Sequence, residues 1–469
     1  MPENPPETPA FAVHAVGLSD VGMRRAANQD AVAIWSRAGA GPGEPIAGDA
    51  LLLVADGMGA HAAGELASQM AAETIPHCYA KSAAEAAPAA LRQAIREANR
   101  RIHAKGQSSP DLVGMGTTCS CLVVTHGAAL LGHVGDSRVY RLRGPVLEQL
   151  TFDHSLVWEM AATTNVSHDK VPSFIPKNVI TRSLGPHDTE SLIVDLEGPH
   201  PLEDGDTFLV CSDGLTGVVD DALAAGVLAA LPPREAAQTL IDLANLRGGP
   251  DNISVIVARA ECLAGKQCVP QPCRRRSTES TVLTGCVAAG CAVAGVLFWL
   301  WGNLTGMLLA AFGLGAAVAL YWLPGGKGKR SNGARLVGGP YGNGPYRRTE
   351  CGDFSDASAT MGKMVKELAS LDARAKDPPE AAPSDAPAAG AAGANGCPAD
   401  DGATPTFQGG LSIDWSPHRE TQAAADAAHD AGDCRRSIAL YAEIIRSVIN
   451  SACDDSTTHR YKAKAPTAR

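Results

Sequence analysis

Aromatic residues are scarce in this chain, in which Phe, Trp and Tyr make up 4% of 469 residues. Charged residues are also few, at 19%, and the formal net charge is −10. Together with 45% hydrophobic residues, this composition excludes a wholly disordered chain, a collagen and a coiled-coil rod. The excess of acidic residues argues against a broad basic surface, so we expect no nucleic-acid partner.

The 13 cysteines contain no Cys-x-x-Cys pair, so the sequence indicates neither a disulfide framework nor a zinc site. Reduced, mostly buried thiols in a cytosolic compartment are the simpler expectation. Residues 1–10 lack basic residues and an apolar core, so we expect a disordered N-terminus and no cleaved secretory signal. Glycine (49) and proline (31) are abundant, which indicates that part of the length is linker.

The longest uncharged run covers residues 281–323 and follows a basic linker at 262–280. Because one membrane span needs about 20 apolar residues, these 43 residues fit two transmembrane helices that turn near Asn303. Basic residues flank both ends, which places both ends in the cytoplasm. We therefore predict a two-span hairpin in the cell membrane, with a buried core hairpin of a soluble domain as the alternative.

Residues 11–261 predict a dense alternation of short strands and helices. The expected strands are 11–18, 51–55, 118–125, 128–134, 207–211 and 253–258. The expected helices are 64–75, 91–105, 222–231 and 234–246. Because many strands are neighbours in sequence, the pattern favours an α+β fold with antiparallel sheets over a series of β-α-β units.

The C-terminal region is expected to be mostly disordered, with short helices. Residues 324–410 have a Gly/Ala/Pro-rich linker composition, interrupted by one amphipathic pattern near 357–375. Residues 411–469 predict a helical hairpin and a tail. The hairpin resembles one tetratricopeptide-type repeat, but a single repeat cannot bury its own apolar face, so an isolated hairpin is the alternative. It is a candidate site for a protein partner.

Five aspartates stand at the ends of apolar, strand-like runs: Asp30, Asp56, Asp136, Asp213 and Asp251. Taken singly, each is more simply a turn or cap residue. If the strands pack in one sandwich, several of these carboxylates meet at one end, and such a cluster stays ionised only with cations between its members. Oxygen ligands without Cys or His at matching spacing select Mg²⁺ or Mn²⁺ rather than zinc.

The same aspartates belong to an ordered series of motifs. The series is Ser19-Asp20-Val21-Gly22, Arg25, Asn28-Gln29-Asp30, Val54-Ala55-Asp56-Gly57-Met58-Gly59, Gly116-Thr117-Thr118, Gly135-Asp136-Ser137-Arg138, Thr181-Arg182-Ser183-Leu184-Gly185, Ser212-Asp213-Gly214-Leu215 and Pro250-Asp251-Asn252-Ile253-Ser254. On these motifs, residues 11–261 resemble the metal-dependent serine/threonine protein phosphatases, protein phosphatase 2C, in their bacterial form. The resemblance does not reach the apolar hairpin or the C-terminal region.

This resemblance implies a four-layer α-β-β-α sandwich of two antiparallel sheets, with a binuclear Mn²⁺ or Mg²⁺ centre at one end. It implies that Asp56 bridges the two ions, that Gly57 offers its carbonyl oxygen, and that Asp213 and Asp251 bind the first ion. Asp30 is expected to orient metal-bound water. Asp136 is expected to form a weaker third site with Asp213.

Arg25 is implied to bind the substrate phosphate, for which its planar, permanently charged guanidinium group is suited. The alternative is an arginine in an ordinary surface ion pair. The general acid is unassigned, because Met58 stands where many eukaryotic relatives carry a histidine. His61 and His154 are candidates, although a structural or surface role is the simpler expectation for each. Residues 166–178 are expected to form a mobile flap beside the site.

The implied reaction is hydrolysis of phosphoserine and phosphothreonine by attack of a metal-bridging hydroxide, with Asp56, Asp213 and Arg25 as catalytic residues. We expect a membrane-anchored phosphatase that opposes Ser/Thr kinases, with its catalytic domain and C-terminus in the cytoplasm. Its expected partners are phosphorylated proteins, including the kinases and their substrates. The alternatives are a catalytically silent, membrane-anchored scaffold and a phosphatase that acts on an anti-sigma-type antagonist.

Overall fold

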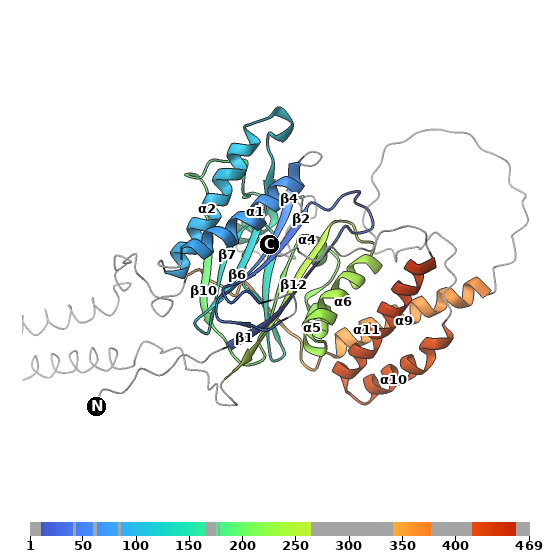
Figure 1. Cartoon of the computed structure of the whole chain (residues 1–469). Coiled ribbons are helices and arrows are strands. Elements are labelled where there is room, and N and C mark those ends of the chain that lie inside the picture. The colour runs from blue at the N-terminus through green and yellow to red at the C-terminus, as the bar shows by residue number, and fades with distance from the viewer. Residues whose placement is uncertain are drawn as a thin grey trace, which may run out of the picture. The chain divides into compact units, whose positions relative to one another are not determined.

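The computed structural model describes residues 11–40, 44–59, 63–82, 86–164, 175–176, 179–263, 341–376 and 415–455. All of these residues belong to one compact unit of the chain. Two antiparallel sheets pack face to face and carry helices on their outer sides (Figure 1). The predicted α+β sandwich of antiparallel sheets is therefore confirmed.

Seven strands form the first sheet, in the order β13 (Arg347–Glu350), β9 (Val146–Gln149), β8 (Arg138–Arg143), β11 (Thr207–Cys211), β12 (Ile253–Cys262), β1 (Phe11–Asp20) and β3 (Ile46–Ala47). The second sheet runs β10 (Asp195–Pro201), β7 (Ala128–Val134), β6 (Cys119–Thr125), β4 (Ala50–Met58) and β2 (Asp30–Ser36), with β5 (Gly116–Thr117) paired to β4. The predicted strands 128–134 and 207–211 match β7 and β11 residue for residue.

Strand β4 shows why the sandwich strands are apolar without interruption. Alternate side chains of a strand point to opposite faces. Leu51 and Leu53 pack with helices α1 (Ala63–Lys81) and α2 (Ala87–Gly106), whereas Leu52 and Val54 pack against the other sheet. Both faces of β4 are therefore buried, which a continuous apolar run requires.

Two further helices, α5 (Asp221–Ala230) and α6 (Pro233–Leu246), cover the outer face of the seven-stranded sheet. Two short helices complete this part of the chain, α3 (Leu156–Thr164) and α4 (Asp213–Thr216). Single 3-10 turns lie at Pro110–Leu112 and Ser416–His418. The four predicted helices are thus all present, with α1 extending six residues beyond its predicted end.

The C-terminal region is more ordered than the sequence predicts. Within the predicted linker, Arg347–Glu350 forms β13 and Ser355–Lys376 forms the 22-residue helix α9. The predicted hairpin is present as α10 (Arg419–Asp430) and α11 (Cys434–Asp455). Helix α9 packs on α5, and α11 packs on both α5 and α6 (Figure 1). Helix α10 packs on α9 and α11. The linker prediction is wrong at β13 because that strand is specified by pairing with β9 rather than by an apolar pattern.

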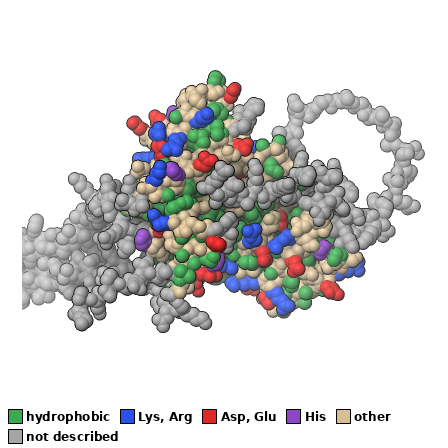
Figure 2. Space-filling view, in the orientation of Figure 1, with side chains coloured by type: hydrophobic (Ala, Val, Ile, Leu, Met, Phe, Trp, Pro, Cys, Tyr) green, Lys and Arg blue, Asp and Glu red, His purple; other side chains and the backbone are tan. Residues whose placement is uncertain are grey.

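One continuous core joins the C-terminal helices to α5 and α6. Its buried members include Leu223, Val227, Leu240, Met361, Val365, Ile438, Tyr441 and Ile445. The outer faces of the same helices carry interspersed acidic and basic side chains (Figure 2). The hairpin therefore buries its apolar face on α5, α6 and α9, so it is not isolated.

No helix within the described ranges is long and apolar enough to cross a membrane. The predicted spans at 281–323 lie outside those ranges, as do residues 1–10, 264–280, 377–410 and most of the predicted flap. Among the described cysteines, Cys119, Cys121 and Cys211 are buried and free, as expected. Cys262 is disulfide-bonded, so the expectation of reduced thiols is wrong at that position.

Candidate active site

The five predicted aspartates come from both sheets at one end of the sandwich. Asp30 and Asp56 lie directly opposite each other in the antiparallel register of β2 and β4. Asp213 begins α4 just after β11, and Asp251 precedes the paired strand β12. Asp136 lies in the turn that connects β7 to β8. The hydroxyl of Ser212 joins the two sheets by donating a hydrogen bond of 2.8 Å to Asp30 Oδ2.

Charges at this end are strongly disfavoured. Burial raises the pKa of Asp30 and of Asp136 to about 7, and the nearby carboxylate of Asp213 adds to both rises. The pKa of Asp56 and that of Asp213 are also raised, again chiefly by burial and then by neighbouring acids. Since each of these shifts reflects the other carboxylates, the aspartates lie within electrostatic reach of one another.

The same carboxylates supply oxygens suited to a divalent cation. The Oδ1 atoms of Asp30, Asp136 and Asp213 are buried and have no hydrogen-bond partner among the described residues. Buried, unpartnered carboxylate oxygens are costly unless something compensates their charge, and hard cations such as Mg²⁺ and Mn²⁺ prefer oxygen donors. The donor set therefore fits such an ion.

One carboxylate of the cluster is paired with a cation. Arg25 Nη2 donates a hydrogen bond of 2.7 Å to Asp251 Oδ2. In the described part of the chain, no group of three or more His, Cys, Asp or Glu side chains is disposed to hold a metal ion as it stands. Binding an ion would therefore require these side chains to change their orientation.

Gly57 is confined by its neighbours. A Cβ atom there would lie 2.2 Å from the carbonyl oxygen of Gly64 and 2.4 Å from that of Gln29. The preceding residue is also held, because Asp56 N–H donates to Thr118 Oγ1 and Asp56 O accepts from the Thr117 hydroxyl, each at 2.9 Å. Only glycine fits at position 57, and the backbone around Asp56 is held in one place.

Comparison with known proteins identifies the fold family. Residues 23–243 match the family model of protein phosphatase 2C. The serine/threonine phosphatase stp of Listeria monocytogenes is 34% identical over 257 residues, which are 53% of this chain and 96% of the relative. The chain belongs to the protein phosphatase 2C family. The predicted resemblance to bacterial members of this family is confirmed.

Other family members match a smaller share of their own length. The serine/threonine protein phosphatase PstP of Mycobacterium tuberculosis is 36% identical over 240 residues, which are 51% of this chain and 43% of PstP. This chain thus matches less than half of PstP. A crystal structure of the PstP catalytic domain in complex with two manganese ions is 34% identical to this chain, with a TM-score of 0.46. The match covers 54% of this chain and 99% of the PstP chain in that crystal structure.

Within this phosphatase domain, Arg25 lies at the aspartate cluster. Its side chain is 51% exposed, and its ion pair is with Asp251, one of the predicted metal ligands. An ion pair was the alternative to phosphate binding, and the structure contains one. Its partner is a member of the aspartate cluster, so the guanidinium group lies beside that cluster.

Asn252 holds a loop beside the aspartate cluster, a role that sequence reasoning missed. Its Nδ2 donates to the carbonyl oxygens of Val21 and Ala27, at 2.9 and 3.0 Å, and its Oδ1 accepts from Gln29 N–H at 2.9 Å. These three bonds hold the loop that carries Arg25 beside Asp251. The only sequence signal was its place next to Asp251 in the Pro250–Ser254 motif.

His154 does not face the site as a general acid. Its side chain is fully buried and is hydrogen-bonded through both ring nitrogens, to Gly135 and Asp195. The structural role that was the simpler expectation is therefore what the structure shows. His61, the other candidate, lies outside the described residues.

Proposed function

We propose that this chain is a metal-dependent phosphoprotein phosphatase that hydrolyses phosphoserine and phosphothreonine. The observation that carries the proposal is the cluster of five aspartates, three of which have a buried oxygen with no partner among the described residues, next to Arg25. Membership of the protein phosphatase 2C family supports it, since the relatives stp and PstP are named serine/threonine phosphatases.

Two Mn²⁺ or Mg²⁺ ions are the proposed cofactors, a choice supported by the two manganese ions of the PstP catalytic domain. Asp56, Asp213, Asp251 and the Gly57 carbonyl would hold them, and Asp136 with Asp213 would hold a weaker third ion. When bound, such ions neutralise phosphate charge and lower the pKa of water.

The chain's own polar groups would orient the reactants. Arg25 is exposed enough to bind two phosphate oxygens once its bond to Asp251 is released or shared. Asp30 accepts from Ser212 through Oδ2, which leaves Oδ1 able to accept a hydrogen bond from a water molecule. This geometry suits Asp30 to orienting the attacking water.

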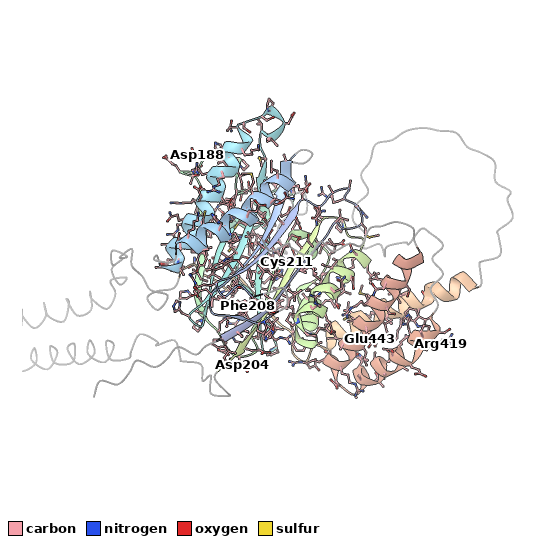
Figure 3. The ribbon with its side chains drawn as sticks, in the orientation of Figure 1. Asp188, Asp204, Phe208, Cys211, Arg419 and Glu443 are labelled. Atoms are coloured by element: carbon pink, nitrogen blue, oxygen red, sulfur yellow. The ribbon has the colours of Figure 1, made fainter. Side chains whose placement is uncertain are left out.

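The test is hydrolysis of a phosphothreonine peptide by the full-length chain in Mn²⁺, with and without EDTA. Asp213→Ala should lower kcat/KM at least about 100-fold, the scale of losing one charge-stabilising group. Asp204→Ala is the matched control, because it also precedes a glycine beside β11 but lies at the opposite end of that strand from Cys211 (Figure 3). Equal activity in Asp213→Ala, or full activity in EDTA, would refute the metal mechanism. An inactive wild type would favour the silent scaffold.

We further propose that residues 281–323 anchor the enzyme in the membrane, with the catalytic domain facing the cytoplasm, where it would oppose Ser/Thr kinases. The uncharged run with basic flanks supports this. The strands on either side, β12 and β13, lie in one sheet, so an intervening chain that crosses a membrane must cross an even number of times. Full-length protein that stays in the supernatant after membrane sedimentation without detergent would contradict the anchor.

A further inference from the structure

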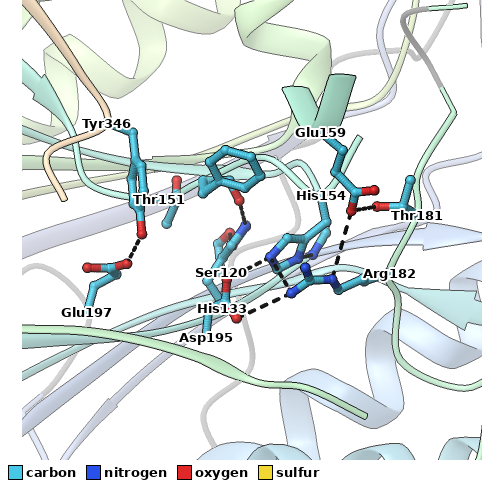
Figure 4. Close-up of polar contacts among 12 residues, drawn as sticks. Ser120, His133, Thr151, His154, Glu159, Thr181, Arg182, Asp195, Glu197 and Tyr346 are labelled. Atoms are coloured by element: carbon cyan, nitrogen blue, oxygen red, sulfur yellow. Dashed lines mark hydrogen bonds and ion pairs between the residues drawn. The ribbon is translucent and has the colours of Figure 1, made fainter. Parts of the chain in front are cut away.

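We infer that His154 is a positioning residue for the turn that carries Asp136, and that Asp195 fixes the ring tautomer in which it acts. This inference rests on the proposed function, since Asp136 matters there as a metal ligand. Figure 4 shows the polar contacts among His154, Asp195 and Arg182.

Two hydrogen bonds tie His154 to the residue before Asp136. The backbone N–H of His154 donates to Gly135 O at 2.7 Å, and Gly135 N–H donates to His154 Nδ1 at 3.0 Å. Gly135 has a φ of +116°, and a Cβ there would lie 2.6 Å from the side chain of Thr118. His154 therefore pairs both backbone polar groups of a glycine that no other residue could replace without strain.

The partners of the ring determine its tautomer. A backbone N–H can only donate, so Nδ1 must carry a lone pair rather than a proton. On the other side, Asp195 Oδ2 lies 2.9 Å from Nε2 and accepts a hydrogen bond from it. Arg182 Nη1 lies 3.3 Å from Nε2 but can only donate, so it cannot bond to a protonated Nε2. Its N–H is instead assigned to Asp195 Oδ1, which lies 3.4 Å away and forms an ion pair with it. The ring is thus neutral and protonated on Nε2.

The surroundings leave the ring little freedom. The His133 ring packs on it with centroids 4.9 Å apart, and is held by the Ser120 hydroxyl at 3.0 Å and the Phe152 carbonyl at 2.9 Å. The backbone carbonyl of His154 accepts from Thr181 N–H at 2.8 Å. One residue therefore joins the Asp136 turn to Thr181 and Arg182, which follow the predicted flap in sequence.

Two substitutions separate the contacts of the two ring nitrogens. In His154→Asn, the amide oxygen can occupy nearly the position of Nδ1 and accept from Gly135 N–H. In His154→Gln, the amide reaches the position of Nε2 near Asp195 and leaves Gly135 N–H without an acceptor. If holding Gly135 is the function of His154, Asn should retain that function and Gln should lose it.

The primary readout is Mn²⁺ binding by the full-length protein. The electron paramagnetic resonance signal of free Mn²⁺ measures it. We expect His154→Gln to weaken the lowest-affinity site about tenfold or more, the scale of losing a residue that supports a ligand, and His154→Asn to stay within about threefold of wild type. His77→Gln, at an exposed position on α1, is the control and should match wild type. Equal affinities in the Asn and Gln variants, whether high or low, would overturn the inference.

A second readout needs neither metal nor activity. Nitrogen-15 NMR of the imidazole groups should show the Nε2–H tautomer for His154 in the metal-free wild type, whereas the Nδ1–H tautomer there would overturn the inference. Asp195→Asn, at a position 30% exposed, should shift the signal towards Nδ1–H, because the amide can donate to Nε2. If circular dichroism shows that His154→Gln does not fold, Asp195→Asn provides the test in its place. An unchanged tautomer in Asp195→Asn would refute the role of Asp195.

The outcomes distinguish this inference from the proposed function. A wild type that binds Mn²⁺ but does not hydrolyse phosphopeptides would refute the proposed function. The binding and NMR comparisons would still test whether His154 positions the turn that carries Asp136. A wild type that hydrolyses phosphopeptides, with Asn and Gln variants alike in Mn²⁺ affinity, would refute the inference alone.

Discussion

Four aspartates of the site, Asp30, Asp56, Asp136 and Asp213, hold their protons more tightly in the folded chain than an exposed acid does. For Asp30 and Asp136 the pKa rises from 3.8 to about 7, mainly through burial. Between these values the folded state keeps protons that the unfolded chain has released, so the free energy of unfolding falls as the pH rises. The site therefore destabilises the metal-free protein at neutral pH.

This leads to a prediction about stability without metal. In EDTA, the melting temperature of the full-length protein should fall between pH 5 and pH 8, and Mn²⁺ should raise it at pH 8. Asp136→Asn removes one of the titrating acids, so its melting temperature should fall less, by about 2–4 °C for each kcal/mol relieved. Differential scanning fluorimetry at both pH values measures this. A wild type and an Asp136→Asn variant with the same pH dependence would contradict it.

Arg25 gives a prediction about catalysis at the residue scale. If it binds the phosphate, Arg25→Ala should lower kcat/KM about 10- to 100-fold, mostly through KM, because a charge-assisted hydrogen bond contributes about 1.5–3 kcal/mol. Arg24→Ala is the control, since Arg24 is the exposed neighbour on the same loop. Steady-state kinetics with a phosphothreonine peptide distinguishes the two. Equal effects of both substitutions would reduce Arg25 to a source of general positive charge.

At the scale of elements, the sequence predicted strands and helices best where both faces are buried. β7 and β11 are short apolar runs bounded by polar residues, and their ends coincide with those predicted. The site aspartates were found for the same reason, because they terminate such runs. β13 was missed because its sequence, Arg347-Arg348-Thr349-Glu350, has an exposed, polar pattern and pairs only at the sheet edge.

The contacts of individual site residues were harder to predict. Asn252 binds the carbonyl oxygen of Val21, 231 positions earlier in the chain, and Gly135 donates to a histidine 19 positions later. Such bonds depend on which strand ends meet in space, and local residue patterns do not contain that information. The identities of the aspartates could therefore be predicted, whereas the residues that hold them in place could not.

The packing of α9 on α5 can be tested through one glycine. A Cβ on Gly226 would lie 2.4 Å from Ala357 Cβ and 3.1 Å from Ile438 Cδ1. Gly226→Ala should therefore destabilise the full-length chain, by about 1–3 kcal/mol, through overpacking. In a chain that ends at residue 263, the same change should stabilise α5 by up to about 1 kcal/mol, because alanine favours helix. Thermal melts of the Gly226 and Gly226→Ala proteins, in the full-length and in the shortened chain, measure the two opposite changes in stability. Stabilisation by Gly226→Ala in both chains would show that α9 does not dock there.

At the scale of the whole molecule, the phosphatase region does not end at residue 261 as a self-sufficient unit. The predicted boundary coincides with the end of β12, but β13 extends the same sheet and α9–α11 share its outer core. Leu223, Val227, Leu240 and Ile241 on α5 and α6 are almost fully buried in that shared core. Without residues 341–455 these side chains would lose much of their cover, at a cost of about 25 cal/mol for each Å² of apolar surface exposed.

A chain that ends at residue 263 should therefore melt at a lower temperature than the full-length chain and bind more of the hydrophobic dye ANS. Val365→Asp in the full-length chain should reproduce part of this loss, because Val365 is fully buried against the shared core and an unpaired charge there opposes docking of α9. Lys363→Asp is the control, since that side chain on the same helix is exposed. If the shortened chain melted at the same temperature and bound no more dye, the C-terminal helices would not contribute to the stability of residues 11–263. If instead Val365→Asp is destabilised and Lys363→Asp is not, segments on both sides of the apolar run 281–323 form one folding unit.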